Sequence, residues 1–276
     1  MVWRIRWSRR VSSWVFLRGL IRESRHWGDF PSAFQRRFSD AQIFTPDLPG
    51  NGVLNDMPSP LTIDAMVDHA RTWLAAREHR RPVYLLGLSM GGMLAVRLAQ
   101  RYPAELAGCV LINSSLRNFS PFYHRLQWRS YGTLLRILMS RNDAVASEQL
   151  VWEMTSSRRP IEPEILRQWI ACRRARPVSM INAVRKVIAA SRCRAGDRAP
   201  KVPLLVLALD HDRLVSPNCS RRIAEAWNAR LCMHPHAGHD LALDDGEWIA
   251  ETTGNWVEGL GNDNFLIEVG VPTNYP

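Results

Sequence analysis

Short apolar runs recur along the chain, and stretches with helical periodicity separate several of them. The runs lie at residues 12–19, 41–50, 81–89, 106–115, 202–210 and 229–239. Each has a centre of about 4–8 mostly apolar or β-branched residues, which is typical of strands covered on both faces. Helical periodicity is clear over residues 63–80 and 93–102. The alternation predicts an α/β fold with a mainly parallel central sheet and helices on both faces.

Residues 116–199 break this alternation. Amphipathic helical patterns follow one another at 131–141, 146–157 and 163–175, with prolines at positions 160, 163 and 177 between and beside them, and no strand pattern is convincing. An all-helical insertion between two core strands is a lid or cap by position. We therefore expect a core of residues 1–115 and 200–261, a helical cap of residues 116–199, and a C-terminal tail, 262–276, of unknown role.

Composition narrows the class of protein. With 276 residues, of which 46% are hydrophobic, the chain can bury one sizeable core. It contains no uncharged apolar window of about 18 residues, so we expect no membrane span, and its N-terminal segment lacks the pattern of a secretory signal. The five cysteines are widely spaced and form no CxxC pair, which argues against a disulfide framework and a cysteine zinc site. These features favour a cytoplasmic protein.

The positive charge is concentrated in one part of the chain. The formal net charge is +10, and residues 114–200 contain 16 Lys+Arg against 6 Asp+Glu, whereas the remainder contains 20 of each. One interpretation is an acidic partner or substrate, and the other is a solvated arginine-rich helical face. No nucleic-acid motif accompanies the charge, so we expect no nucleic-acid partner.

The segment GLSMGG, residues 87–92, lies between an apolar run and a helical run. Ser89 is the centre of a G-x-S-x-G pattern flanked by Gly87 and Gly91. A serine hydroxyl is a weak nucleophile that must be presented on a sharp turn beside a base, and the glycines let strand and helix approach there. The start of a helix also favours a developing oxyanion. A plain strand-to-helix turn is the structural alternative.

A serine nucleophile needs a histidine and a carboxylate. His239 follows the last predicted strand in HPHAGHDLALDD, on a loop at the carboxyl end of the sheet, where open parallel sheets collect their chemistry. Asp210 and Asp212 follow another strand, and either suits the role of the acid. The order Ser, Asp, His is that of the α/β-hydrolases.

A metal site is the competing hypothesis for the same histidines. His234, His236 and His239 have nearly the H-x-H-x-D-H spacing of metallo-β-lactamase-like sites, but Gly238 stands at the position of the aspartate. No further set of ligands stands out in the sequence. We therefore expect neither a metal nor an organic cofactor.

Taken together, these segments resemble the α/β-hydrolase superfamily from Trp14 to Leu260. The matching motifs are VFLRGL, DLPGNG, GLSMGG, ALDHDRLVSP and AGHDLALDD. Within the superfamily the chain looks most like small capped carboxylesterases of the pimeloyl-acyl-carrier-protein methyl ester esterase group.

The resemblance implies a role for each motif residue. Ser89 would be the nucleophile and His239 the base, and alignment of DRLV with the family's acid loop selects Asp212 over Asp210. The backbone N–H groups of Leu20 and Met90 would form the oxyanion hole. Arg18 departs from the family, which usually has histidine there; it would contact an acidic substrate or form an ion pair with Glu23.

The resemblance implies a serine hydrolase that cleaves a carboxylic ester or thioester through an acyl-enzyme. Carbon–carbon bond hydrolases and a menaquinone-pathway lyase use the same triad, and a non-catalytic ligand-binding protein on this fold is the third alternative. The aromatic and apolar residues of the insertion would line an acyl pocket or form its core; they are Phe119, Phe122, Tyr123, Trp128, Leu134, Trp152 and Trp169. The expected substrate is a small ester, free or bound to acyl carrier protein, and the expected state is a monomer or dimer.

Overall fold

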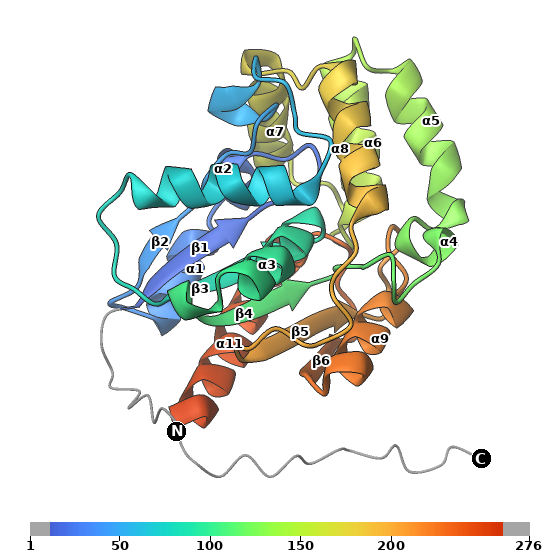
Figure 1. Ribbon diagram of the computed structural model, residues 1–276. Coiled ribbons are helices and arrows are strands. Elements are labelled where there is room, and N and C mark those ends of the chain that lie inside the picture. Colours follow the sequence, from blue (N-terminus) through green and yellow to red (C-terminus); the bar gives the residue numbers. More distant parts are fainter. Residues whose placement is uncertain (1–11, 262–276) are drawn as a thin grey trace, which may run out of the picture.

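The computed structural model describes residues 12–261, and its centre is a six-stranded sheet with the order β2-β1-β3-β4-β5-β6 (Figure 1). All neighbouring strands pair in parallel. The strands are β1 (Ser13–Leu17), β2 (Gln42–Phe44), β3 (Val83–Leu88), β4 (Leu106–Ile112), β5 (Leu204–Leu209) and β6 (Arg230–His234). Each lies inside one of the six predicted runs, so the predicted parallel α/β architecture is confirmed. The predicted tail, 262–276, lies outside the described residues.

Both faces of the sheet are covered by helices, which explains why the strands read as continuous apolar runs. One face packs against α2 (Ile63–Ala75), α3 (Met90–Arg101) and α9 (Pro217–Trp227). The other packs against α1 (Phe30–Arg37) and α11 (Gly246–Gly261). Neighbouring residues of β3 illustrate the period of two, because Leu85 belongs to the first core and Leu86 to the second. Shorter elements complete this part: η1 (Ser24–Trp27), η2 (Gly52–Leu54), η3 (Pro103–Glu105) and α10 (Leu241–Asp244).

Between β4 and β5 the chain forms only helices, which we call the helical insertion (residues 116–199). Its elements are α4 (Phe122–Arg125), η4 (Trp128–Ser130), α5 (Tyr131–Met139), α6 (Ala144–Thr155), α7 (Pro163–Ala175) and α8 (Met180–Arg192). Pro163 begins α7, as its fixed φ allows at a first helical position. Figure 1 shows α5 to α8 grouped at the top of the molecule, on the side away from α9 and α11.

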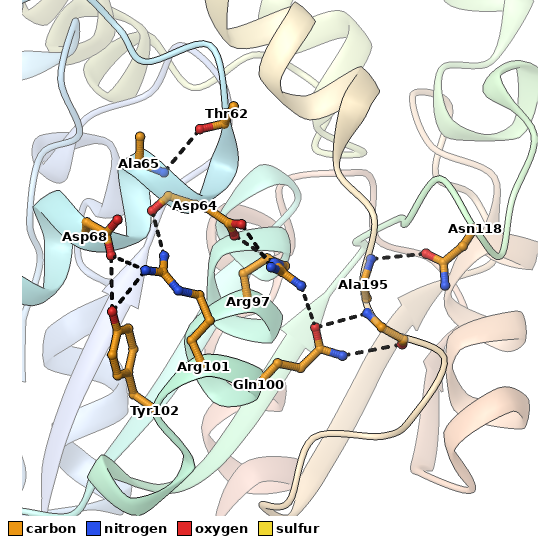
Figure 2. A network of polar contacts seen from close by, with 11 residues as sticks. Thr62, Asp64, Ala65, Asp68, Arg97, Gln100, Arg101, Tyr102, Asn118 and Ala195 are labelled. Atoms are coloured by element: carbon orange, nitrogen blue, oxygen red, sulfur yellow. Dashed lines mark hydrogen bonds and ion pairs between the residues drawn. The ribbon is translucent and has the colours of Figure 1, made fainter.

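Polar contacts join the two connections of the helical insertion to the helix that begins after Ser89 (Figure 2). On the outgoing side, Asn118 Oδ1 accepts a hydrogen bond from the backbone N–H of Ala195 on the returning side, at 3.2 Å. The side-chain amide of Gln100 in α3 donates from Nε2 to Gly196 O and accepts at Oε1 from the Gly196 N–H. Arg97, also in α3, forms a bidentate ion pair with Asp64 of α2, at 2.7 and 2.9 Å. The base of the insertion is therefore fixed to the core helices.

Within residues 12–261, no helix is both long and apolar enough to cross a membrane.

Candidate active site

Ser89 lies between β3 and α3 in a backbone conformation that is uncommon for a residue with a side chain. Its φ is 57° and its ψ is −117°. Such a conformation costs on the order of 1–3 kcal/mol and persists only where the surrounding structure enforces it. The backbone N–H of Ser89 donates to Ile112 O at 2.8 Å, and its carbonyl accepts from Ser114 Oγ at 2.9 Å. The end of β4 thus holds the serine on a sharp turn, with its side chain partly exposed.

The glycines around Ser89 are required by close backbone approach. A Cβ on Gly91 would lie 1.9 Å from Leu17 O, and one on Gly87 would lie 2.4 Å from Gly91 O. Helix α3 can therefore begin directly against β1 and β3 only if both positions lack a side chain. The first turn of α3 starts immediately after Ser89, so the positive end of the helix dipole lies at the serine.

His239 and Asp212 are joined by a short, buried hydrogen bond. His239 Nδ1 lies 2.7 Å from Asp212 Oδ2, and both side chains are almost fully buried. The other carboxylate oxygen, Oδ1, accepts from the backbone N–H groups of Leu214 and Val215, at 2.8 and 2.9 Å. These bonds fix the carboxylate and leave Nε2 as the imidazole nitrogen available for a proton transfer.

Asp212 also sets the basicity of His239. Burial alone lowers the pKa of His239, but the negative charge of Asp212 and its hydrogen bond outweigh burial, so the pKa is raised above its usual value. A histidine of this kind accepts a proton more readily than a free imidazole does. The other candidate acid, Asp210, instead forms an exposed ion pair with Arg221 at 3.0 Å.

Two contacts bring the loop of His239 to the strand ends near Ser89. Asn113, which directly follows β4, donates from Nδ2 to His239 O at 2.9 Å. Asp240 forms a buried bidentate ion pair with Arg18, at 3.0 and 2.7 Å. Arg18 precedes Gly19, where an added Cβ would lie 3.4 Å from Ser89 Cβ. The structure therefore gathers the predicted serine, histidine and acid segments at one edge of the sheet.

Arg18 has a different partner from the one proposed from the sequence. It pairs with Asp240, whereas Glu23 pairs with Arg25. Glu23 was one of the two partners expected from the sequence, but the turn after β1 directs the Arg18 guanidinium toward the loop after β6 and over the ring of Trp27, 4.7 Å from its centroid. Burial raises the pKa of Asp240, but the charge and hydrogen bonds of Arg18 outweigh it, and the pKa is lowered.

The loop after β1, residues 18–22, carries the predicted oxyanion donor Leu20 and is held by a chain of hydrogen bonds from the helical insertion. Asn51 Nδ2 donates to Leu20 O at 3.3 Å and to Arg22 O at 2.7 Å. Asn51 Oδ1 accepts from Lys186 Nζ of α8. Both Asn51 and Lys186 are completely buried. Met90, the other predicted donor, is the first residue of α3.

Lys186 is unusual because its ammonium group is buried and, among the residues that the structure describes, only one acidic residue, Asp47, offsets the loss of solvation. Burial lowers its pKa from 10.5 to about 7, and the charge of Asp47 opposes this effect only in part. Arg22, at the other end of the same chain of contacts, binds the buried Glu148 of α6 at 2.6 Å. The loop 18–22 is thus tied to the insertion at two points.

The aromatic residues predicted for an acyl pocket divide into two groups. Phe122, Tyr123 and Trp128 are 73%, 51% and 68% exposed. The others take part in packing: Phe119 contacts Trp227 with ring centroids 5.2 Å apart, and Trp152 and Trp169 contact each other at the same distance. Trp152 has no exposed surface to offer a ligand.

A cleft of about 720 Å³ lies between the helical insertion and the loops after β5 and β6. Its lining includes Arg129, Thr133 and Glu153 from the insertion, and Asp212 and His236 from the core. It borders the candidate acid and the loop before His239, because its lining includes Asp212 and Gly238.

The histidines of the competing metal hypothesis do not form a ligand set. His234 Nε2 contacts Asp245 at 3.2 Å and its Nδ1 accepts from the backbone of His236 and Ala237, so both ring nitrogens are engaged. Among residues 12–261, a different group comes within 4.8 Å of one another: Glu23, His26 and Cys172. Arg25 pairs with Glu23 there, and burial followed by the charges of Arg22, Arg18 and Arg25 lowers the pKa of His26. This positive surrounding disfavours a cation.

Several residues of the site escaped the sequence analysis. Asp240 directly follows His239, and Asn51 lies inside the DLPGNG motif, so both had a positional signal. Asn113 is the residue after a strand, which is where polar site residues collect. Lys186 had one weak signal: it is one of only two lysines in a chain with 36 Lys+Arg.

Comparisons with known proteins agree with this architecture. An enol-lactonase from Burkholderia xenovorans has a TM-score of 0.73 at 19% identity, covering 90% of this chain and 92% of that one. A bacterial membrane phospholipase A has 0.71 at 20%, covering 91% and 80%. A thermophilic esterase from Thermogutta terrifontis has 0.67 at 20%, covering 91% and 90%. At these identities the likeness establishes the fold.

The sequence itself identifies the family. No curated protein matches the chain. The family model described as "Alpha/beta hydrolase family" matches residues 14–252, which is most of the chain and includes the three candidate catalytic residues and all the strands except the first residue of β1. The chain therefore belongs to the alpha/beta hydrolase family.

Proposed function

We propose that this protein is a serine hydrolase that cleaves a carboxylic ester or thioester, with Ser89 as nucleophile, His239 as base and Asp212 as acid. The observation that carries the proposal is the 2.7 Å bond between His239 Nδ1 and Asp212, at the same sheet edge as a serine with a φ of 57°. A strained serine near an oriented histidine is better explained by nucleophilic catalysis than by a purely structural turn.

In this mechanism His239 Nε2 takes the proton of the Ser89 hydroxyl while Oγ attacks the carbonyl carbon. The N–H groups of Leu20 and Met90 stabilise the oxyanion, and the positive end of α3 adds to this effect. The protonated His239 then gives its proton to the leaving group, and the acyl-enzyme forms. Water, deprotonated by the same histidine, releases the acid and restores Ser89.

We assign residues 1–115 and 200–261 to the core and residues 116–199 to a cap that controls access to Ser89. The support for this assignment is that the insertion is tied to the loop 18–22 through Lys186 and through the pair Arg22–Glu148. A substrate that moves the insertion would also move the Leu20 peptide. Specificity would then depend on the insertion, as is common for loops and lids that complete a site.

The first experiment compares wild type with Ser89→Ala in the hydrolysis of p-nitrophenyl esters of increasing acyl length. We expect turnover in wild type, loss of turnover in the variant, and covalent labelling by a fluorophosphonate only when Ser89 is present. Ser191→Ala is a suitable control, because that exposed hydroxyl donates to Ile188 O within α8 and is not the proposed nucleophile.

Each alternative predicts a different result. Equal ester turnover in wild type and Ser89→Ala would refute the role of Ser89. Labelling without ester turnover would favour a carbon–carbon bond hydrolase or a lyase. Neither labelling nor turnover in folded wild type would favour a ligand-binding role.

A further inference from the structure

The exposed apolar side chains of this protein are confined to one region. Among residues 12–261, fifteen large hydrophobic side chains are exposed, and none lies on a strand or α-helix of the core. Twelve belong to the helical insertion and three to the loop 53–61; they are Val53, Met57, Leu61, Phe122, Tyr123, Trp128, Tyr131, Leu135, Leu138, Met139, Val145, Met180, Ile181, Val184 and Val187. Scattered exposed apolar residues need no explanation, but a concentration of this kind marks an interaction site.

On two helices the exposed residues form stripes. In α5 they are Tyr131, Leu135, Leu138 and Met139, and in α8 they are Met180, Ile181, Val184 and Val187. Their spacing of three or four residues places each set on one helix face. The loop 53–61 adjoins α8, because Asn182 donates to the carbonyls of Asn55 and Met57 at 3.2 and 3.0 Å.

The charge that accompanies these stripes is positive. Neither α5 nor α8 contains an acidic residue, whereas α5 carries Arg136 and α8 carries Arg185 and Arg192 in addition to the buried Lys186. Within the described part of the chain, Arg129 and Arg136 have no acidic partner, in contrast to Arg167 of α7, which pairs with Glu164. The insertion and its flanks also carry the whole net charge of +10.

We propose that the helical insertion docks on an anionic lipid surface through the exposed faces of α5 and α8. An apolar face with arginine beside it and no acidic residue is the pattern of helices that lie in the interface of a membrane. Tyr123, Trp128 and Tyr131 supply rings that are favoured at the headgroup level. An acidic protein surface would match the charge, but it does not call for two aliphatic stripes.

Docking on lipid does not require catalysis. A further consequence is that the protein takes its ester from the lipid surface, and this consequence rests on the proposed function. The binding experiment therefore uses Ser89→Ala protein, so that failure of one idea leaves the other intact. The probes are vesicles of phosphatidylcholine alone and of phosphatidylcholine with an equal amount of phosphatidylserine. We expect co-sedimentation with the anionic vesicles that weakens as salt is added.

Two groups of variants locate the contact. The triple change Leu135→Ser, Leu138→Ser and Met139→Ser should lower partitioning by about 100-fold, because three apolar side chains lose their burial. Arg136→Gln should lower it about fivefold, as expected for one basic residue at an anionic surface. The matched control Arg167→Gln removes one arginine from the same insertion outside the two stripes, and it should bind like the parent. Circular dichroism confirms that each variant is folded.

Other results would overturn the proposal. Equal binding by the triple variant and the parent would exclude the α5 face, and equal binding to neutral and anionic vesicles would exclude charge recognition. Absence of vesicle binding, with a one-to-one complex formed with acyl carrier protein, would mean that the partner is an acidic protein and not a lipid surface.

Fluorescence gives an independent measurement of the contact. Brominated lipid should quench Trp128 fluorescence, and Trp128→Phe should lose that quenching.

Discussion

Replacing Lys186 by methionine should change stability and activity in opposite directions. The change keeps the length of the side chain and removes its charge. Folding lowers the pKa of this lysine from 10.5 to about 7, a difference that corresponds to about 5 kcal/mol against the charged form. Methionine avoids this cost, but it also loses the hydrogen bond to Asn51, which is worth about 1–3 kcal/mol for a charged donor. We expect Lys186→Met to be more stable than wild type by about 2–4 kcal/mol below pH 7.

The sign of the pH dependence follows from proton binding. Below about pH 7 the lysine is charged in both states, so the folded state bears the full cost of burying the ammonium. Between about pH 7 and 10.5 the unfolded state binds more protons, so the stability of wild type rises with pH across this interval. Methionine has no proton to lose, so the contribution of this site disappears and the two stability curves converge as the pH rises.

Urea unfolding of both proteins from about pH 6 to about pH 10 measures this convergence. Arg185→Met is the matched control: Arg185 is the preceding residue of α8 and binds Ser59 O, without a contact to Asn51 among the described hydrogen bonds. It should leave the pH dependence of wild type unchanged. Parallel curves for wild type and Lys186→Met, or a less stable methionine variant at the lowest pH, would refute the burial argument.

The same change should impair the proposed chemistry. Without Lys186, Asn51 loses its anchor, and the loop that carries Leu20 is less firmly placed. We expect the turnover of p-nitrophenyl esters to fall about 10- to 100-fold with a smaller effect on KM, as for a displaced catalytic group. Unchanged turnover in Lys186→Met would show that the contact serves folding alone.

Two further variants test the candidate site. Asp212→Asn should lower kcat by about 10⁴-fold, and it should move the acid limb of the pH–rate profile to lower pH because His239 loses the charge that raises its pKa; an unmoved limb would contradict the pairing. Arg18→Met should destabilise the fold at neutral pH by about 3–5 kcal/mol, because Asp240 then becomes a buried, uncompensated carboxylate. The double variant with Asp240→Asn should recover most of that loss in urea unfolding, and no recovery would mean that Arg18 acts through other contacts.

The strands of the sheet and the turn at Ser89 could be predicted from the sequence because each depends on residues that are close together along the chain. The strands of a doubly covered parallel sheet are apolar throughout, so each run could be found without knowing its neighbours. The turn at Ser89 requires residues without a side chain at positions 87 and 91. Both are glycines, and each lies only two positions from Ser89 in the sequence. His239 and the pair Asp210/Asp212 could be located because they follow strands, although only the resemblance to a family selected Asp212.

The remaining parts of the site depend on contacts between distant segments. Arg18 and Asp240 are 222 positions apart, and Lys186 and Asn51 are 135 apart. No periodicity joins such residues, so the sequence could offer only an acidic substrate or the nearby Glu23 as the partner of Arg18. In the insertion, amphipathic spacing predicts helices with an apolar face, but it does not tell whether that face is buried. Trp152 and Leu135 both lie on such helices, yet Trp152 is buried in an interior cluster and Leu135 is exposed to solvent.

The arrangement of charge separates the two proposed activities. The arginines of the loop after β1 and of η1 are neutralised internally, since Arg18 pairs with Asp240, Arg22 with Glu148 and Arg25 with Glu23. These pairs hold the loop 18–22. Because their opposite charges cancel, they produce little electrostatic field that could attract a distant ligand. The arginines beside the exposed stripes, such as Arg129 and Arg136, have no such partners among residues 12–261, so their field extends into solvent. Attraction to an anionic surface therefore acts through the insertion, and the insertion is attached to the Leu20 loop through Lys186. A lipid surface that moved α8 would act on the proposed oxyanion hole through that lysine.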